Sequence, residues 1–170
     1  YHVLIATDLT PDSLQILKDA PDVTTNIVPP NLPAVRDALV SAHALIARED
    51  VRIDNPLLDH ASHLKVIGRV GAGLSGLDME AATGRGIIVT NTPDVLSDAT
   101  AEIAILLMLG AARRASEGDR LVRSKQWKDW SPAFMVGTQT TGKRFGVIGM
   151  GRVGQVAAKR ARGFDMEIHY

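Results

Sequence analysis

Short apolar runs alternate with amphipathic segments along the first half of the chain. The apolar runs are not interrupted by regularly spaced polar residues, which is typical of parallel strands covered on both faces. The amphipathic segments space apolar residues as a helix does, with Leu14 and Leu17 in Asp12–Lys18 as one example. The predicted strands are Val3–Ala6, Thr25–Val28, Ala44–Ala47, Leu64–Val70 and Ile87–Val89.

Residues typical of helix starts and helix ends support this division into strands and helices. Pro33 stands where the first turn of a helix accepts proline. Asp78–Thr83 is helical in character, and Gly84 and Gly86 follow it as residues that end helices. An alternating order of strands and helices predicts a doubly wound α/β unit with a parallel sheet.

The pattern changes near residue 98. Asp98 is an N-cap type of residue, and a long apolar helix is predicted from about Thr100 to Ala115. Its apolar stretch, Ile103–Ala112, is much shorter than the ~20 residues that a membrane span needs. We therefore expect a buried helix and no membrane partner.

A second α/β unit begins late in the chain. Its predicted elements are a strand at Arg144–Ile148, a helix at Val153–Arg162 and a strand at Met166–Tyr170. We therefore expect two domains, residues 1–97 and residues 98–170, the second being only the first part of a larger sheet.

Composition and charge exclude several classes of protein. Apolar residues make up 45% and charged residues 22%, the range of a globular protein with a real core. The 19 basic residues balance the 19 acidic ones, so nothing draws the chain toward nucleic acid. Cysteine is absent, which excludes disulfides and cysteine-ligated zinc and allows the reducing cytoplasm where we expect this protein. We expect no signal peptide, because the chain enters directly into the apolar run Val3–Thr7.

A G-x-G-x-x-G pattern is formed by Gly149, Gly151 and Gly154, between a predicted strand and a predicted helix. This is the setting of the dinucleotide-binding fingerprint. The first glycine permits a tight turn, the second lets a pyrophosphate approach the backbone, and the third lets the helix pack closely. The helix N-terminus then offers free N–H groups to the phosphates, and Arg152 adds charge. The competing interpretation is a plain strand-to-helix turn.

The same spacing occurs earlier, at Gly71, Gly73 and Gly76, again after a predicted strand. Backbone N–H groups in such a loop can form a nest for a small anion such as a carboxylate. Two dinucleotide sites in so short a chain are not expected. The residues alone leave two interpretations of this cluster, an anion-binding loop or a structural turn.

The two glycine clusters and the residues between them resemble the D-isomer-specific 2-hydroxyacid dehydrogenases. The resemblance is close from Lys65 onward, and within the family Pro132–Gly137 and Lys159–Phe164 look most like the glyoxylate/hydroxypyruvate reductase branch. The matching segments are Lys65–Arg69, Gly71–Gly73, Leu77–Ala82, Gly86–Ile87, Asn91–Pro93, Ala101–Glu102, Trp127, Thr141–Lys143 and Val147–Gly154.

The resemblance implies a flavodoxin-like substrate domain followed by the start of a Rossmann domain that binds NAD or NADP. It implies an oxidoreductase that transfers a hydride between NAD(P)H and a small 2-oxo acid or D-2-hydroxy acid, of the glyoxylate or hydroxypyruvate type. The implied substrate-binding residues, which hold the carboxylate, are Val70, Gly71, Ala72 and Gly73. The implied cofactor-binding residues are Thr100 on the nicotinamide side, Arg152 and Val153 at the pyrophosphate, and the turn glycines Gly149, Gly151 and Gly154.

The resemblance also implies which residues to expect elsewhere. The catalytic Arg, Glu and His of the family are expected beyond Tyr170, so no residue of this chain is assigned as catalytic. We interpret Glu102 as structural or hinge-forming and not as catalytic. His60 and His63 have the spacing of a helical metal pair, but no third ligand accompanies them, so we predict no metal site. The strand end that would choose between NAD and NADP coincides with the end of the chain, which leaves that choice open.

We expect a homodimer, from the resemblance and from the aromatic segment Trp127–Met135. Within it, Trp130 and Met135 either reach toward a neighbouring active site or pack in the core. Two other hypotheses stay open. One is a non-enzymatic NAD(H) sensor or corepressor on the same scaffold. The other is an inactive fragment with an exposed strand edge at Met166–Tyr170.

Overall fold

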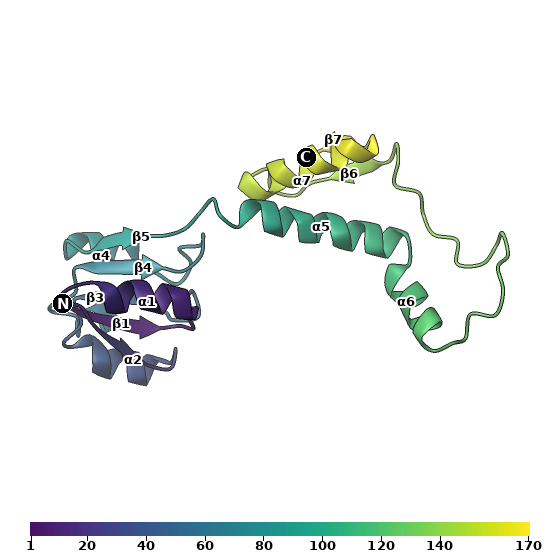
Figure 1. Ribbon diagram of the computed structural model, residues 1–170. Coiled ribbons are helices and arrows are strands. Elements are labelled where there is room, and N and C mark those ends of the chain that lie inside the picture. Colours follow the sequence, from purple (N-terminus) through teal and green to yellow (C-terminus); the bar gives the residue numbers. More distant parts are fainter. The chain divides into compact units, whose positions relative to one another are not determined.

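The computed structural model describes residues 1–170 and divides into two compact units, Tyr1–Pro93 and Asp94–Tyr170 (Figure 1). The division lies a few residues before the boundary between 97 and 98 that the sequence suggests. An ion pair between Asp94 and Arg152, 3.0 Å long, ties the connecting residues to the second unit.

The first unit contains a parallel sheet of five strands in the order β2-β1-β3-β4-β5. This is the strand order of flavodoxin-like doubly wound folds, so the predicted fold class is confirmed. The strands are β1 (His2–Ala6), β2 (Thr24–Ile27), β3 (Ala44–Ala47), β4 (Val66–Arg69) and β5 (Ile88–Thr90).

Short polar residues set the helix starts of this unit. Thr10 caps α1, Asn31 caps α2, Asp54 caps α3 and Asp78 caps α4, each by accepting a hydrogen bond from a backbone N–H three residues later. The helices are α1 (Pro11–Asp19), α2 (Leu32–Leu39), α3 (Asn55–Leu58) and α4 (Met79–Gly84). The sequence pattern did not predict α3, because a helix of one turn is too short to show a periodic apolar face.

The core of the first unit lies on the central strands. Leu4, Leu45 and Ile67 are fully buried there, and Val35 and Leu39 pack against them from α2. The edge strands β2 and β5 are mostly exposed. Burial on both faces, expected for every strand, therefore applies fully to β1 only, since buried and half-buried residues alternate in β3 and β4.

The second unit pairs a long helix with a small parallel sheet. The elements are α5 (Ser97–Ala112), α6 (Ala115–Arg123), β6 (Arg144–Gly146), α7 (Arg152–Ala161), a 3-10 turn (Arg162–Phe164) and β7 (Glu167–His169). Ile105 of α5 packs with Ala161 and Met166 in a core of their own. The strand–turn–helix–strand order predicted here is confirmed.

The start of α5 differs from the prediction. The helix begins at Ser97 without a side-chain cap, and Asp98 lies inside its first turn. The Asp98 carboxylate accepts a hydrogen bond from Arg160 of α7 at 2.8 Å, so helix pairing uses the group that was expected to cap. The predicted N-cap was therefore wrong.

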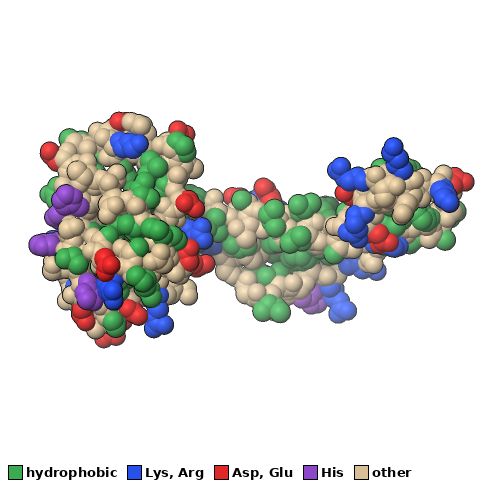
Figure 2. Space-filling view, turned by 90° about the horizontal axis from the view of Figure 1, so that it is seen from below, with side chains coloured by type: hydrophobic (Ala, Val, Ile, Leu, Met, Phe, Trp, Pro, Cys, Tyr) green, Lys and Arg blue, Asp and Glu red, His purple; other side chains and the backbone are tan.

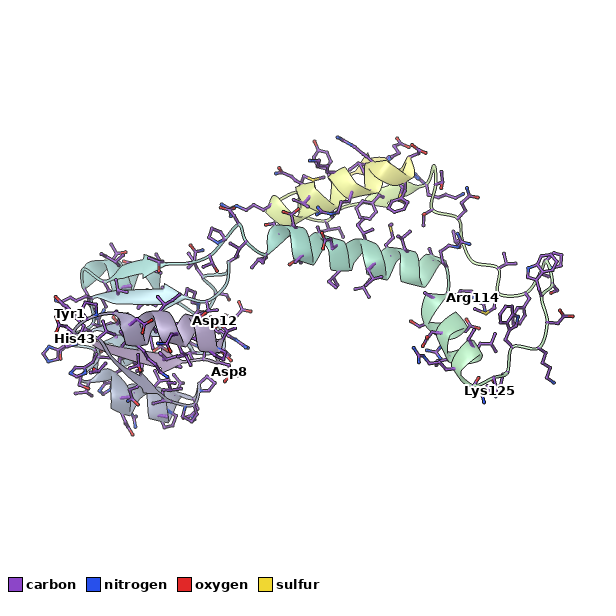
Figure 3. All side chains as sticks on the ribbon, in the orientation of Figure 1. Tyr1, Asp8, Asp12, His43, Arg114 and Lys125 are labelled. Atoms are coloured by element: carbon purple, nitrogen blue, oxygen red, sulfur yellow. The ribbon has the colours of Figure 1, made fainter.

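The other end of α5 also differs. The helix stops at Ala112, before the predicted end at Ala115, because Arg114 adopts a left-handed conformation with φ 56°. The Arg114 guanidinium donates to both carboxylate oxygens of Glu117 at 2.8 and 2.6 Å, which fixes the start of α6 (Figure 3). These hydrogen bonds hold the pKa of Glu117 below its ordinary value.

Burial of α5 is only partial within this chain. Ala101 and Ile105 are buried, whereas Leu106 and Leu107 are 62% and 65% exposed. None of the helices is both long enough and apolar enough to cross a membrane.

Candidate functional site

Both glycine clusters lie at the carboxyl ends of parallel strands, the edge where open α/β sheets bind ligands. The first, Gly71–Gly76, follows β4 in the first unit, and the second, Gly149–Gly154, follows the β6 region in the second unit. Each begins with a glycine in the left-handed region, φ 116° at Gly71 and φ 94° at Gly149. A side chain at either position would strain the backbone.

The residues after β5 fasten the start of the first turn. The Gly71 N–H donates to the Thr92 hydroxyl at 3.2 Å, and the Thr92 N–H donates to the Gly71 carbonyl at 2.9 Å. The Asn91 side-chain amide donates to the Ala72 carbonyl at 2.9 Å. Three hydrogen bonds therefore anchor the start of the turn to the segment after β5.

The backbone N–H groups of Ala72 and Gly73 have no acceptor within the protein. Both residues lie at the accessible carboxyl edge, Ala72 half-buried and Gly73 exposed. Successive N–H groups left free in a rigid turn form a concavity suited to an anion. Of the two interpretations left open for this cluster, its geometry favours the anion-binding loop.

A buried cation lies beside this turn. Arg69, the last residue of β4, is only 2% exposed. Its guanidinium donates to the Val51 carbonyl at 3.2 Å and to the Ser75 carbonyl inside the turn, while its Nε has no partner. Burial lowers the pKa of Arg69, and the nearby Glu49 and Asp50 act in the opposite direction.

The second turn leads directly into a helix. Gly151 is the N-cap of α7 and uses no side-chain cap, and the N–H groups of Arg152, Val153 and Gly154 have no acceptor within the protein. A Cβ at Gly151 would meet no atom within 4 Å, so the space in front of these groups is open. Free N–H groups, a helix dipole and open space at one point fit the pyrophosphate of a dinucleotide.

Gly154 has a different role in the same turn. A Cβ built there would lie 2.2 Å from the Gly149 carbonyl oxygen and 3.2 Å from the Val147 side chain. Only glycine allows α7 to start so close to the strand that precedes the turn. The close packing that the sequence analysis attributed to this glycine is present, against the turn itself.

Two arginines of α7 contact acidic residues at the start of the second unit. Arg152 pairs with Asp94, and both side chains are largely exposed. Arg160 pairs with Asp98 and Glu102 at 2.8 and 3.3 Å. The pairing of Glu102 agrees with the structural role expected for it. Thr100 is exposed on the same turn of α5.

The aromatic segment is not part of the core. Trp130 is 72% exposed and Trp127 is 53% exposed, which excludes core packing of Trp130 within this chain. Met135 is half-buried, and its methyl group would lie 3.7 Å from a Cβ on Gly118 of α6. An open groove between α6 and this segment is lined by Arg114, Glu117, Arg120, Leu121, Ser124, Gln126, Ala133, Phe134 and Met135.

Three histidines gather at the amino ends of the strands, opposite the glycine turn. The His43 ring lies 5.5 Å from the His2 ring and 6.0 Å from the His63 ring, measured between centroids. Figure 2 shows histidine side chains in purple on one side of the first unit, and Figure 3 labels His43 beside Tyr1. The His43 Nδ1 accepts a hydrogen bond from the His2 backbone N–H, and no group of three or more ligating side chains is arranged to hold a metal.

Residues 3–163 match the model of the D-isomer specific 2-hydroxyacid dehydrogenase family, catalytic domain. The match covers most of the chain and includes both glycine turns. The chain belongs to this family. The family expected from the sequence is therefore confirmed.

Individual relatives agree with this family. The chain is 47% identical over 131 residues to a glyoxylate reductase of Pyrococcus horikoshii, which covers 75% of this chain and 39% of that protein. The solved structure of the TT0316 protein of Thermus thermophilus is 36% identical, with a TM-score of 0.91 over 99% of this chain and 55% of that one. A Polaromonas sp. JS6 66 protein described as NAD-binding is 38% identical, with a TM-score of 0.87 over 99% of this chain and 54% of that one. The chain thus spans about half the length of its relatives or less.

Three residues around the first turn were present in the matching segments without a role: Arg69, Asn91 and Thr92. A signal for Arg69 was available, since it is a charged residue near the end of the mostly apolar predicted strand Leu64–Val70. The signal for Asn91 and Thr92 was weaker, because polar residues after a strand are usual in loops.

Proposed function

We propose that the full-length protein containing this chain reduces small 2-oxo acids to D-2-hydroxy acids with NADH or NADPH. The observation that carries this proposal is the pair of free N–H groups at Ala72 and Gly73, held rigid beside a buried cation. Such a site suits a carboxylate. Family membership supplies the reaction type.

Glyoxylate and hydroxypyruvate are the substrates we propose. A relative 47% identical over 131 residues is a glyoxylate reductase. Val70 and Gly71 complete the substrate loop, since the N–H groups of both are used to hold its shape.

The residues proposed to bind the cofactor are in the second unit. Gly149 and Gly151 shape the turn, Gly154 allows the helix to start there, and the N–H groups of Arg152 and Val153 face the pyrophosphate. Thr100 is proposed to contact the nicotinamide side. The chemistry that a bound NADH or NADPH supplies is the hydride.

The reaction requires a hydride on the carbonyl carbon and a proton on the carbonyl oxygen, which together form the D-2-hydroxy acid. The residues of this chain bind and orient, and the Ala72 and Gly73 N–H groups hold the carboxylate so that the carbonyl carbon has a fixed position. The proton donor that the family resemblance implies is a His beyond Tyr170.

We also propose a homodimer in which Trp130 and Met135 face the second copy. Exposed apolar side chains of Trp127, Trp130 and Phe134 support this, since aromatic residues are enriched at the centres of protein interfaces. Hydrophobic side chains are also visible on the second unit in Figure 2. Sedimentation of the full-length protein and of its Trp130→Ser variant tests it, and a wild-type monomer at micromolar concentration would refute it.

Absorbance at 340 nm tests the enzymatic proposal. The full-length protein is mixed with NADH or NADPH and with glyoxylate, hydroxypyruvate or, as a neutral control, glycolaldehyde. We expect oxidation of one cofactor with both acids and little with glycolaldehyde. Cofactor binding without turnover of either acid would favour a sensor over an enzyme.

A further inference from the structure

We propose that Arg69 is a positioning residue for the substrate loop, and that its buried positive charge strengthens carboxylate binding at Ala72 and Gly73. The inference rests on the function proposed above. It assigns a role to a side chain outside the substrate loop that is not expected to touch the substrate.

The hydrogen bonds of Arg69 explain the positioning. One arm of the guanidinium donates to Val51, in the segment after β3, and the other donates to Ser75, inside the glycine turn. A Cβ on Gly76 would lie 3.7 Å from that second arm. The side chain therefore joins the far half of the turn to the neighbouring segment, while Asn91 and Thr92 fasten the near half.

Backbone hydrogen bonds of Ile53 also hold the far half of the turn. The Ile53 N–H donates to the Gly76 carbonyl at 2.7 Å, and the Asp78 N–H donates to the Ile53 carbonyl at 2.8 Å. With Arg69, the bond to Gly76 holds the far end of the turn through its carbonyl groups, and Asn91 and Thr92 hold the near end. The N–H groups between the two ends stay free, which is the arrangement that an anion requires.

The second part of the proposal, that Arg69 strengthens carboxylate binding, rests on the charge of its side chain. A guanidinium remains protonated even when it is buried, and none of the ion pairs of this chain includes it. Glu49 lies close to the turn, with its carboxylate oxygen 3.1 Å from where a Gly73 Cβ would stand, but it is exposed to solvent. A buried cation without a buried counter-ion is costly, and an anion bound at the turn would offset part of that cost.

The test compares an acid and a neutral aldehyde as substrates of the full-length enzyme. Arg69→Met keeps a long side chain but removes the charge and the two hydrogen bonds. We expect kcat/KM for glyoxylate to fall about 10- to 100-fold, as is typical when a charged hydrogen-bonding partner is lost, mostly through KM. The value for glycolaldehyde, which has no carboxylate, should change less than about twofold, within the range of a surface substitution.

Arg69→Lys and Arg36→Met are the matched variants. Lysine restores the charge but not the two-armed geometry, so it should recover part of the lost glyoxylate affinity. Arg36 is exposed and pairs only with its neighbour Asp37, so Arg36→Met should behave as the wild type. If Arg69→Met fails to fold, Arg69→Lys decides, because wild-type KM for glyoxylate in that variant would contradict the role of the geometry.

The outcomes separate this inference from the proposed function. A wild-type enzyme that fails to reduce glyoxylate overturns the proposed function and this inference with it. A working wild type whose Arg69→Met variant keeps its KM for glyoxylate overturns the inference alone. Equal losses for glyoxylate and glycolaldehyde would also overturn it, because a general disturbance of the fold does not distinguish the acid from the neutral aldehyde. Binding of NADH, measured by fluorescence, should be the same in every variant.

Discussion

The two glycine turns share the spacing G-x-G-x-x-G, and both follow a parallel strand, yet they are built differently. In the first, Gly76 has φ 74° and the chain continues through a loop before α4. In the second, Gly154 is already inside α7, and its missing side chain makes room for the Gly149 carbonyl. The third glycine is therefore needed for its backbone conformation in the first turn. In the second turn it is needed because a side chain would collide with the Gly149 carbonyl.

The support of the two turns differs as well. The first turn is held through its carbonyl groups by Arg69, at the end of β4, and by Asn91, in the segment after β5. The second turn is held by the start of its own helix, where the Gln155 side chain donates to the Met150 carbonyl at 3.0 Å and the exposed Arg152 pairs with Asp94. A loop held from outside can bind a small anion with a few N–H groups, whereas a helix start adds a dipole suited to a larger phosphate group.

The largest effect is expected from Gly154→Ala. The new methyl group would lie 2.2 Å from the Gly149 carbonyl oxygen, so α7 or the turn must move. We expect unfolding of the second unit to become easier by about 2 kcal/mol, as for other overpacked sites, and cofactor binding to be lost. Denaturant unfolding and NADH fluorescence measure the two effects. Gly163→Ala, where a Cβ has open space, is the control. A Gly154→Ala variant that is as stable as the wild type and binds NADH normally would contradict this prediction.

Gly151→Ala should weaken cofactor binding at the second turn without lowering the stability of the second unit. A Cβ there meets no protein atom within 4 Å, so stability should change by less than about 0.5 kcal/mol. A pyrophosphate close to the backbone would meet the methyl group, and we expect the Kd for NADH to rise about tenfold, roughly the loss of one charged hydrogen bond. Isothermal titration measures this Kd. An unchanged Kd would mean that the phosphates do not approach Gly151.

Asn91→Ala loosens the first turn without touching the second. It removes the 2.9 Å hydrogen bond to the Ala72 carbonyl. A loss of about 1 kcal/mol, the net value of one such bond, corresponds to a KM for glyoxylate about fivefold higher. The Kd for NADH should stay the same. Asn26→Ala, an exposed residue of β2, is the matched control, and a rise in the NADH Kd of Asn91→Ala would contradict the independence of the two turns.

Lowering the pH is expected to reduce the stability of the first unit more than that of the second. This is the smallest of the four expected effects. Partial burial and then the neighbouring His2 lower the pKa of His43 below its ordinary 6.5, and the chain's amino group, His63 and Lys65 act in the same direction. Above pH 6.5 both folded and unfolded states are neutral at His43. Below it the unfolded chain binds a proton first, so stability falls as the pH decreases toward the folded pKa and then levels off.

Urea unfolding between pH 7.5 and pH 5 measures this dependence in the wild type and in His43→Gln. The variant should lose less stability over that range than the wild type. Equal losses in the two proteins would assign the pH dependence to other groups.

Much of the fold followed from local pattern. Short, mostly apolar runs predicted all five strands of the first sheet, and residues such as Asp78 marked helix starts. The start of α5 was predicted wrongly because a carboxylate suited to capping was used instead for pairing with Arg160, which lies 62 residues away. No local signal distinguishes those two uses of an aspartate.

The sequence by itself determined where both turns lie and which family the chain belongs to, because glycine spacing and strand context are local properties. Only the tertiary structure decided how each turn is held. Arg69 reaches Val51 across 18 positions, and Asn91 reaches Ala72 across 19. Equal spacing along the chain produced two differently supported turns, because Val51 and Asn91 come from segments that only the folded sheet brings to the first turn.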